Sequence, residues 1–468
     1  MPTPALDAAH LPVVEELGAR FAAQGHELAL VGGSVRDRLQ SQLVPDLDFA
    51  TSAHPEATER CLAGWADATW DMGRAFGTIG AQKGPWRLEI TTYRADSYAS
   101  DSRKPDVVFG HSLVGDLGRR DFTVNAMAIT LPARQLVDPY GGKKDLAARL
   151  LRTPGRPEDS FTDDPLRMLR AARFTAQLGF AVAPEVSAAI TAMAQRIAIV
   201  SAERVRDELI KLVESAQPRR GLALLVDTGL ASHVLPELPA LRLERDEHHR
   251  HKDVYEHTLT VLEQAMALED RLPEDRPDFV VRFAALMHDV GKPRTRRFGP
   301  DGTVTFHHHD VVGAKLTRKR MQALRFPGNV TDAVARLVEL HLRFHGYGSG
   351  EWTDSAVRRY VRDAGPLLER LHVLTRADCT TRNRRKAERL RRTYDQLEQR
   401  ITALRAQEEL EAIRPDLDGN EIMTILDVPP GPLVGSAYRH LLELRMEHGP
   451  LGRQRAREEL LAWWANHG

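Results

Sequence analysis

Two patterns of apolar and polar residues divide the chain. The first 150 residues combine a segment of helical period at residues 11–23 with short apolar runs that predict strands, at residues 28–31, 47–50, 88–93 and 107–109. Beyond Asp145, arginine- and leucine-rich segments of helical period continue almost to the C-terminus, interrupted by proline and glycine breaks. The pattern predicts an α+β protein, with a mixed head followed by a helical body.

Length and composition limit the class of protein. A chain of 468 residues suggests about three domains at roughly 150 residues each. Hydrophobic residues make up 42% and charged residues 28%, which is typical of a globular protein and excludes a disordered or membrane chain. The first ten residues lack the basic and apolar regions of a secretory signal. We therefore expect a cytoplasmic protein that does not enter a membrane.

Cysteine content and net charge argue against a zinc-thiolate site and against a chain that is basic throughout. Cys61 and Cys379 are too far apart for a CxxC or zinc-thiolate pattern. Sixty-five basic residues balance sixty-five acidic ones, so any contact with RNA must use a local patch. One such stretch, residues 376–400, carries nine Lys and Arg against four acids. It is either a solvated helix face or a contact with an RNA backbone.

A glycine turn followed by two carboxylates is the first candidate site. Gly32 and Gly33 follow an apolar strand and precede a predicted helix, where the backbone can approach a phosphate. Asp46 and Asp48 are two residues apart, so they share one face of a strand. Paired carboxylates repel unless cations lie between them, which points to magnesium and phosphate chemistry. Glu89, in another alternating segment, is a candidate third carboxylate, and an exposed acidic strand end is the alternative.

Residues 163–174 predict a helix with a polar ridge. Asp164, Arg167, Arg170 and Arg173 recur every three residues, beside an apolar stripe. One carboxylate and one guanidinium can satisfy the amino donor and ring-nitrogen acceptor of cytosine or adenine, whereas guanine and uracil present the reverse order. An ordinary Asp–Arg pair within a helix is the alternative.

Five segments in order resemble the bacterial class II nucleotidyltransferases, the group of tRNA CCA-adding enzymes and bacterial poly(A) polymerases. They are GGSVRD, DLDFAT, EITTYR, RRDFTVNAMA and DDPLRMLRAARF. The resemblance implies a polymerase-β-like head with Asp46 and Asp48 as magnesium ligands. It also implies nucleotide contacts, at Gly33, Arg36, Arg120, Asp121, Asp164, Arg167, Arg170 and Arg173. Asp163 stands where the family often has Glu.

A second metal chemistry is indicated further along the chain. His257, the adjacent His288 and Asp289 at the end of an apolar helix, and the distant Asp378 resemble the ligand set of the HD phosphohydrolase superfamily. In two-metal members, further ligands lie at the positions of His309 and His341. Imidazoles with carboxylates suit Mn, Ni, Co, Fe or Zn, and such a metal lowers the pKa of a bound water. Whether this domain hydrolyses a substrate or serves only as structure is left open, as is an ordinary helical role for each histidine.

These observations together predict an enzyme that adds C, C and A to the 3′ end of tRNA from CTP and ATP, with Mg²⁺ and release of pyrophosphate. A poly(A) polymerase shares the head motifs, an HD phosphohydrolase with an RNA-binding head is a rival from another class, and a non-catalytic RNA-binding protein is a third. The predicted parts are a head at 1–145, a helical neck at 146–245, an HD domain at 246–390 and a helical tail at 391–468.

Overall fold

The computed structural model describes residues 11–41, 46–94, 109–110, 112–242, 253–273, 276–300, 303–346, 353–379, 384–407 and 413–467. The chain forms two compact units, Met1–Pro236 and Glu237–Gly468. This division into two units does not test the four parts expected from the sequence, which stay a prediction. No helix in the described ranges is long and apolar enough to cross a membrane.

A seven-stranded sheet forms the head of the first unit, in the order β3-β4-β5-β2-β1-β6-β7. Strands β2 and β5 are parallel, and the other neighbours are antiparallel. The strands are β1 (Leu28–Val31), β2 (Asp46–Thr51), β3 (Ala68–Trp70), β4 (Thr78–Lys83), β5 (Trp86–Thr92), β6 (Ala128–Leu131) and β7 (Leu136–Val137).

Three of the predicted strands are confirmed, as β1, β2 and β5. Of the fourth, residues 107 and 108 lie outside the described part of the chain, and Phe109 forms only an isolated bridge with Arg94. Strand β1 is an inner strand against which two helices pack, and it is buried at all four positions, which explains its continuous apolar run.

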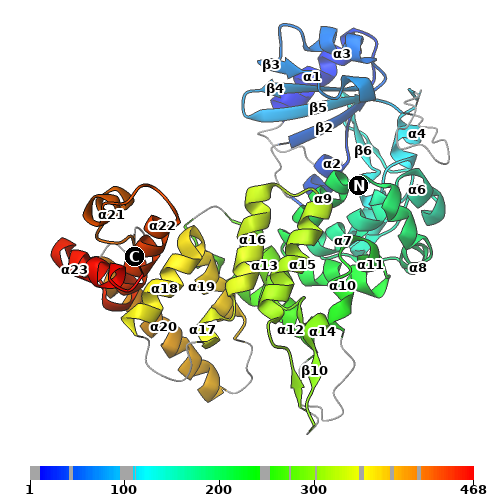
Figure 1. Cartoon of the computed structure of the whole chain (residues 1–468). Helices are drawn as coiled ribbons and strands as arrows, with labels where there is room; N and C mark the ends of the chain where they lie inside the picture. Colours follow the sequence, from blue (N-terminus) through cyan, green and yellow to red (C-terminus); the bar gives the residue numbers. More distant parts are fainter. Residues whose placement is uncertain are drawn as a thin grey trace. The chain divides into compact units, whose positions relative to one another are not determined.

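Helices cover the sheet (Figure 1), with α1 on β1 and β6 and α3 on β4 and β5. Val14, Leu17 and Phe21 of α1 recur at helical spacing and are fully buried, which fixes this helix on the sheet. The helices of this part are α1 (Leu11–Ala23), α2 (Gly33–Leu39), α3 (Pro55–Leu62), α4 (Leu113–Gly118) and α5 (Gly142–Ala148).

The rest of the first unit is helical apart from a short parallel pair of β8 (Leu150–Leu151) and β9 (Ala181–Val182). Helix α7 packs on α9 and α10. The helices are α6 (Pro157–Asp163), α7 (Leu166–Leu178), α8 (Pro184–Met193), α9 (Ala202–Val213), α10 (Pro218–Asp227) and α11 (Ala231–Val234).

The single helix predicted over residues 163–174 is wrong at its start. Helix α6 ends at Asp163, Asp164 is extended with φ −143° and ψ 99°, and α7 begins at Leu166. The cause is Pro165, because a proline disfavours helical backbone at the residue before it. Asp164 therefore lies in a break between two helices rather than on the ridge of one.

The second unit is a set of helices with one small hairpin. Helix α13 packs on α12, α16 and α19, and α15 packs on α16. The elements are α12 (Val254–Ala267), α13 (Phe279–Met287), α14 (Lys292–Thr295), β10 (Arg297–Phe298), β11 (Val304–Thr305), α15 (His309–Ala323), α16 (Gly328–Leu340), α17 (Arg343–Gly346), α18 (Asp354–Ala364), α19 (Leu368–Ala377) and α20 (Arg384–Gln407).

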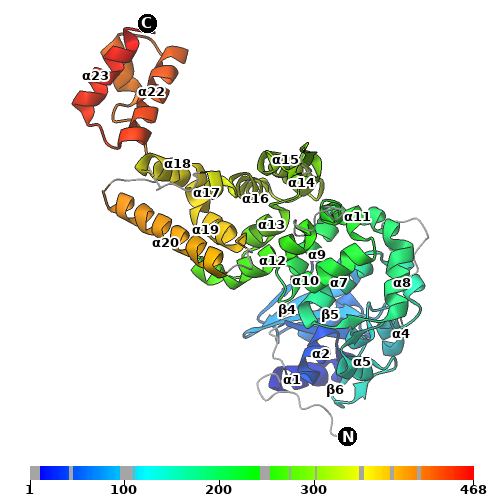
Figure 2. The ribbon, with the colours of Figure 1, turned by 90° about the horizontal axis from the view of Figure 1, so that it is seen from below.

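Three C-terminal helices form a core of their own, around Ile422, Leu441 and Leu460. They are α21 (Gly419–Leu426), α22 (Pro432–His448) and α23 (Arg453–Trp464), and Figure 2 shows α22 and α23 packed together. Arg358 of α18 donates to the carbonyl oxygen of Met446 at 3.1 Å, which ties this cluster to the preceding helices. The expected α+β class, with a mixed head and a helical body, is confirmed.

Candidate functional site

Three carboxylates lie together on two neighbouring inner strands of the sheet, β2 and β5. Asp46 and Asp48 alternate on β2 with the buried Leu47 and Phe49, so both acids face away from the core. The register of the parallel pair places Glu89 of β5 directly beside Asp48. Burial, followed by the charge of Glu89, raises the pKa of Asp48 to about 6. The structure thus brings the predicted third carboxylate to the predicted pair.

The glycine turn lies against these acids. Gly32 has φ +68°, and a Cβ there would lie 3.0 Å from the Nη1 of Arg120 and 3.8 Å from the Oδ2 of Asp48. The backbone angle favours glycine, and an added Cβ would also crowd the guanidinium of Arg120. Ser34 joins the turn to β2, since its hydroxyl donates to the carbonyl oxygen of Asp46 at 3.2 Å and accepts from the amide of Asp48 at 3.0 Å.

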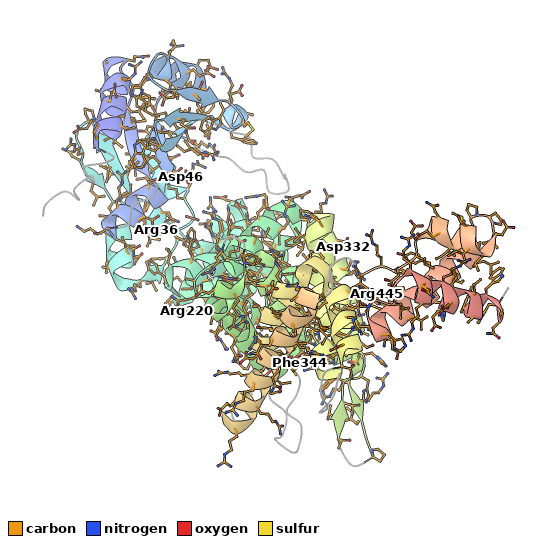
Figure 3. All side chains as sticks on the ribbon, turned by 90° about the vertical axis from the view of Figure 1, so that its left-hand side faces the viewer. Arg36, Asp46, Arg220, Asp332, Phe344 and Arg445 are labelled. Atoms are coloured by element: carbon orange, nitrogen blue, oxygen red, sulfur yellow. The ribbon has the colours of Figure 1, made fainter. Side chains whose placement is uncertain are left out.

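Arg36 is held in place from two sides. Its guanidinium donates to both carboxylate oxygens of Asp37, at 2.7 and 2.9 Å, and to the side-chain oxygen of Asn125 at 2.7 Å. Asn125 in turn donates to Asp121 at 2.9 Å. Figure 3 labels Arg36 and Asp46, which come from α2 and β2. Sequence reasoning did not single out Asn125, although it lies in the RRDFTVNAMA segment.

The partly exposed Arg170 forms an ion pair with the buried Asp121. Arg170 donates through Nε and Nη2 to Oδ2 of Asp121, at 2.9 and 2.6 Å. Burial would raise the pKa of Asp121, but the Arg170 charge and the bonds from Asn125 and Arg170 outweigh it and lower the pKa to about 2. Asp121 is therefore a fixed anion that orients Arg170.

A second carboxylate, missed from the sequence, neutralises the same arginines. Glu208 of α9 is 4% exposed and lies 3.4 Å from Nη1 of Arg170 and 3.0 Å from Nε of Arg173. Arg173 also lies over the ring of Phe174, 4.1 Å from its centroid. Burial, with the neighbouring Arg170 charge, lowers the pKa of Arg173 to about 10, so it stays cationic at neutral pH.

Asp164 and Arg167 are each fixed by residues outside the predicted ridge. Asp164 accepts from the amide of Leu166 at 3.1 Å and pairs with Arg204 of α9 at 2.7 Å. Arg167 donates to the hydroxyl of Ser160 at 2.9 Å and to the carbonyl oxygen of Arg119 at 2.6 Å. The alternative of an Asp–Arg pair within one helix does not hold, because Asp164 precedes α7.

All twelve residues predicted for the head site line one cavity of about 860 Å³. Ten basic and six acidic side chains contribute to its walls, which favours an anionic ligand. The structure adds lining residues that the sequence did not indicate, namely Arg87, Arg94, Arg119, Arg204 and Lys211. A volume of this size is ordinary for a small-molecule site.

The six predicted ligands of the HD region also converge. His257 lies on α12, and His288, His309, His341 and Asp378 lie at ends of α13, α15, α16 and α19. Two groups have metal-ligand spacing, His257 with His288 and Asp289, and Asp289 with His309 and His341. Asp378 joins them at 3.0 Å from the Nε2 of His257. Asp289 is common to both groups.

The histidines are oriented for metal binding. Nδ1 of His288, His309 and His341 lies 2.8, 2.8 and 2.6 Å from a backbone carbonyl oxygen, so Nδ1 carries the proton and Nε2 is left with its lone pair. These three Nε2 atoms are buried, and within the described ranges they have no hydrogen-bond partner. Burial, then the charge of His288, lowers the pKa of His341 to about 4, which keeps it neutral. The donor set fits one or two divalent transition metals.

Three domain models match the chain in order. The "Poly A polymerase head domain" matches residues 28–152, the "Probable RNA and SrmB- binding site of polymerase A" matches residues 179–241, and the "HD domain" matches residues 254–383. The order of these matches agrees with the order of the two sites along the chain.

Relatives and solved structures give the same picture. An A-adding tRNA nucleotidyltransferase of Deinococcus radiodurans is 36% identical over 93% of this chain and 95% of its own length. A CCA-adding enzyme of Bacillus subtilis is 41% identical, over 47% of this chain and 54% of its own length. The crystal structure of a Bacillus stearothermophilus CCA-adding enzyme in complex with CTP superposes with a TM-score of 0.69 at 25% identity, covering 99% of both chains.

Proposed function

Because the chain belongs to the family of tRNA nucleotidyltransferases and poly(A) polymerases, we propose that it adds cytidine, cytidine and adenosine to the 3′ end of tRNA. CTP and ATP are the donors, and pyrophosphate is released. The observation that carries the proposal is one cavity that is lined both by three carboxylates and by many arginines. Arginines bind the phosphates of a triphosphate, and paired carboxylates bind the magnesium ion that accompanies it.

Asp46 and Asp48 are the proposed magnesium ligands, with Glu89 beside them. Burial and then the charge of Glu89 raise the pKa of Asp48, and a bound cation would offset both effects. Magnesium bound there supplies charge stabilisation to the attacking and leaving oxygens. Their position on β2, the central strand of the sheet, keeps the carboxylate geometry rigid.

The arginines bind and orient the triphosphate. Arg36, Arg170 and Arg173 each have a fixed direction, set by Asp37, Asp121 and Glu208. The resemblance to the family gives Arg120 and Asp121 a place near the ribose and phosphates. The 3′-hydroxyl oxygen of the RNA then bonds to the α-phosphorus, and the bond from that phosphorus to the pyrophosphate oxygen breaks.

Asp164 and Arg167 select the base. The carboxylate accepts from the exocyclic amino group of cytosine or adenine, and the guanidinium donates to N3 or N1. A guanine or uracil places like groups against both, at a cost of about 1–3 kcal/mol for each unsatisfied group. The supports on Asp164 and Arg167, from Arg204, Ser160 and the Arg119 carbonyl, keep the two groups in a constant orientation.

Addition of adenosine alone is the second candidate. It is favoured by one observation, that the Deinococcus radiodurans relative aligned over 93% of this chain is an A-adding enzyme, whereas the Bacillus subtilis CCA-adding relative aligns over 47%. A poly(A) polymerase uses the same head motifs, but none of the named relatives above carries that name.

The HD centre is proposed as a separate divalent-metal site, held by His257, His288, Asp289 and Asp378, with His309 and His341 completing a second position. Mn, Ni, Co, Fe and Zn all suit these donors. Hydrolysis of a phosphoester there is an additional activity in this proposal. Because its proposed substrate is tRNA, we propose that the protein acts in the cytoplasm.

Two tRNA substrates separate the candidates, one lacking the whole CCA end and one lacking only the terminal A. Each is incubated with CTP, ATP or both, and the products are resolved at single-nucleotide length. A CCA-adding enzyme extends the first by C, C and A and then stops. An A-adding enzyme extends the second substrate but not the first, and a poly(A) polymerase adds a long A tail. Loss of every product would contradict a nucleotidyltransferase.

A further inference from the structure

A short hairpin with an exposed aromatic side chain separates the metal ligands of the HD centre. Strands β10 and β11 follow α14, just after Asp289, and lead into α15, which begins at His309. Phe298 is 68% exposed. The guanidinium of Arg296 lies 4.6 Å from the centroid of its ring. Figure 1 shows the hairpin, labelled β10, projecting away from α12 and α14.

The base of the hairpin adjoins the metal centre. The register pairs Phe298 with Val304 and Arg297 with Thr305, and Phe306 follows directly after the second of these pairs. The ring of Phe306 lies 5.6 Å from Nζ of Lys292. Lys292 itself pairs with Asp289 at 2.6 Å.

The backbone of Phe306 makes a second link. Its carbonyl oxygen accepts from Nδ1 of His309 at 2.8 Å, and a carbonyl oxygen has no proton to give. The base of the hairpin is therefore anchored to a residue of each ligand group, His309 directly and Asp289 through Lys292.

The hairpin and the helix before it carry unneutralised positive charge. Arg294 of α14 and Arg297 of β10 are exposed, and within the part of the chain that the structure describes no carboxylate pairs with Arg294, Arg296 or Arg297. Arg318 on the neighbouring α15 differs, because it pairs with Asp332 at 3.0 Å. A basic strand with a solvent-exposed ring recognises a polyanion that also offers flat faces for stacking.

We propose that this hairpin binds single-stranded RNA, with a base stacked on Phe298 and the phosphates against Arg294 and Arg297. A duplex hides the faces of its bases, so the partner is a single strand or a frayed end. The choice of RNA rests on the proposed function. The stacking and phosphate contacts use only the hairpin and the adjoining α14, and they are independent of the nucleotide-adding cavity.

The test is binding of the full chain to a fluorescently labelled oligoadenylate of about six nucleotides, within the site size of small single-strand binders. No nucleoside triphosphate is present, so a failure of nucleotide addition does not affect the readout. Phe298→Ala should weaken binding about tenfold, the effect of one stacked base, while Phe298→Trp should retain it. Arg294→Ala with Arg297→Ala should lower the salt dependence by about 0.7 per lost phosphate contact.

The matched control is Lys315→Ala with Lys319→Ala, which removes two exposed cations from α15 and should keep the wild-type affinity. Thermal melts and addition of nucleotides to tRNA establish that each variant is folded. A second probe places 4-thiouridine in the oligonucleotide, and crosslinks should map to the peptide that contains Phe298. Equal affinity of wild type and Phe298→Ala, or crosslinks confined to other peptides, would overturn the proposal. Competition by inorganic polyphosphate as strong as by RNA would reduce the hairpin to an unspecific basic patch and overturn it as well.

Discussion

The head cavity and the HD centre both collect carboxylates, but they balance the charge differently. In the head, Asp121 and Glu208 are paired with Arg170 and Arg173, and ten basic residues face six acids across the cavity. In the HD centre, Asp289 faces imidazoles whose Nε2 atoms are buried without a hydrogen-bond partner among the described residues.

This difference distinguishes a site suited to a ligand that binds and leaves, such as a triphosphate, from a site suited to a permanently bound metal ion. The guanidiniums of the head already have anionic partners and can add phosphate contacts while those partners hold them in place. A buried lone pair without a donor is costly unless a partner binds it, and the metal ion proposed for the HD centre would be that partner. Helix ends supply the HD ligands, whereas strand alternation supplies the carboxylates of the head.

The largest effect is expected at the carboxylates of β2. Asp46→Ala or Asp48→Ala should abolish addition of both C and A, with a loss well beyond the 10–100-fold that changes outside the ligand shell produce. Binding of tRNA should survive, because it depends on basic surface elsewhere. Single-turnover addition and a filter-binding assay measure the two quantities.

A carboxylate of the same head that does not line the cavity is the control. Asp71 is exposed, and Asp71→Ala should leave addition unchanged. Substantial transfer by either β2 variant at saturating magnesium would show that these acids are not the metal ligands.

The HD centre should lose metal in steps. Asp289 belongs to both ligand groups, so the double change His288→Ala with Asp289→Ala should remove all bound transition metal, whereas His341→Ala should remove about half. Addition of CCA should persist in each variant, since the head has its own carboxylates. Elemental analysis gives the metal content, after a thermal melt has shown that the variant is folded.

If a folded double variant lost nucleotide addition in proportion to its loss of metal, the two sites would be functionally coupled. The contrast drawn between them would then be wrong. Unchanged metal content would instead remove His288 and Asp289 from the ligand set.

Features that depend on neighbouring residues in the sequence were predictable, whereas contacts between distant segments were not. Alternation along β2 is local, so the shared face of Asp46 and Asp48 was predictable. The register that sets Glu89 beside Asp48 is a contact between strands, and the pattern alone offered Glu89 only as a candidate. Glu208 and Arg204 were missed because α9 packs on α7 only in the folded chain.

The break at Asp164 had a local signal that the three-residue spacing of charges concealed. Pro165 disfavours helical backbone at Asp164, and this rule outranks periodicity at a single position. The HD ligands were predictable by resemblance, but the carbonyl partners that orient their rings depend on where each helix ends. The roles of all these residues remain predictions.

A smaller effect is expected where the head chooses a base. Asp164→Ala or Arg167→Ala should alter the ranking of the four nucleotides more than it weakens affinity for the triphosphate, because the arginine wall is intact. Each lost hydrogen-bonding group corresponds to about 1–3 kcal/mol of discrimination. Single-addition rates with each nucleotide measure the ranking, and an unchanged ranking would leave the pair with a structural role only.

The smallest effect tests whether the head tolerates loss of one supporting charge. Arg204 is 54% exposed at its side chain and pairs with Asp164 at 2.7 Å, so Arg204→Ala should reduce base discrimination by less than about fivefold, the range of an exposed ion pair. The amide of Leu166 still holds Asp164 in that variant. Arg206→Ala is the control, since Arg206 lies on the same helix and pairs with Asp207. The readout is the ratio of rates for ATP and GTP, which a merely destabilised protein would not change. If Arg204→Ala reduced base discrimination as much as Asp164→Ala, Arg204 would itself contact the base. The head would then resemble the HD centre, because its activity would depend on every residue of the site.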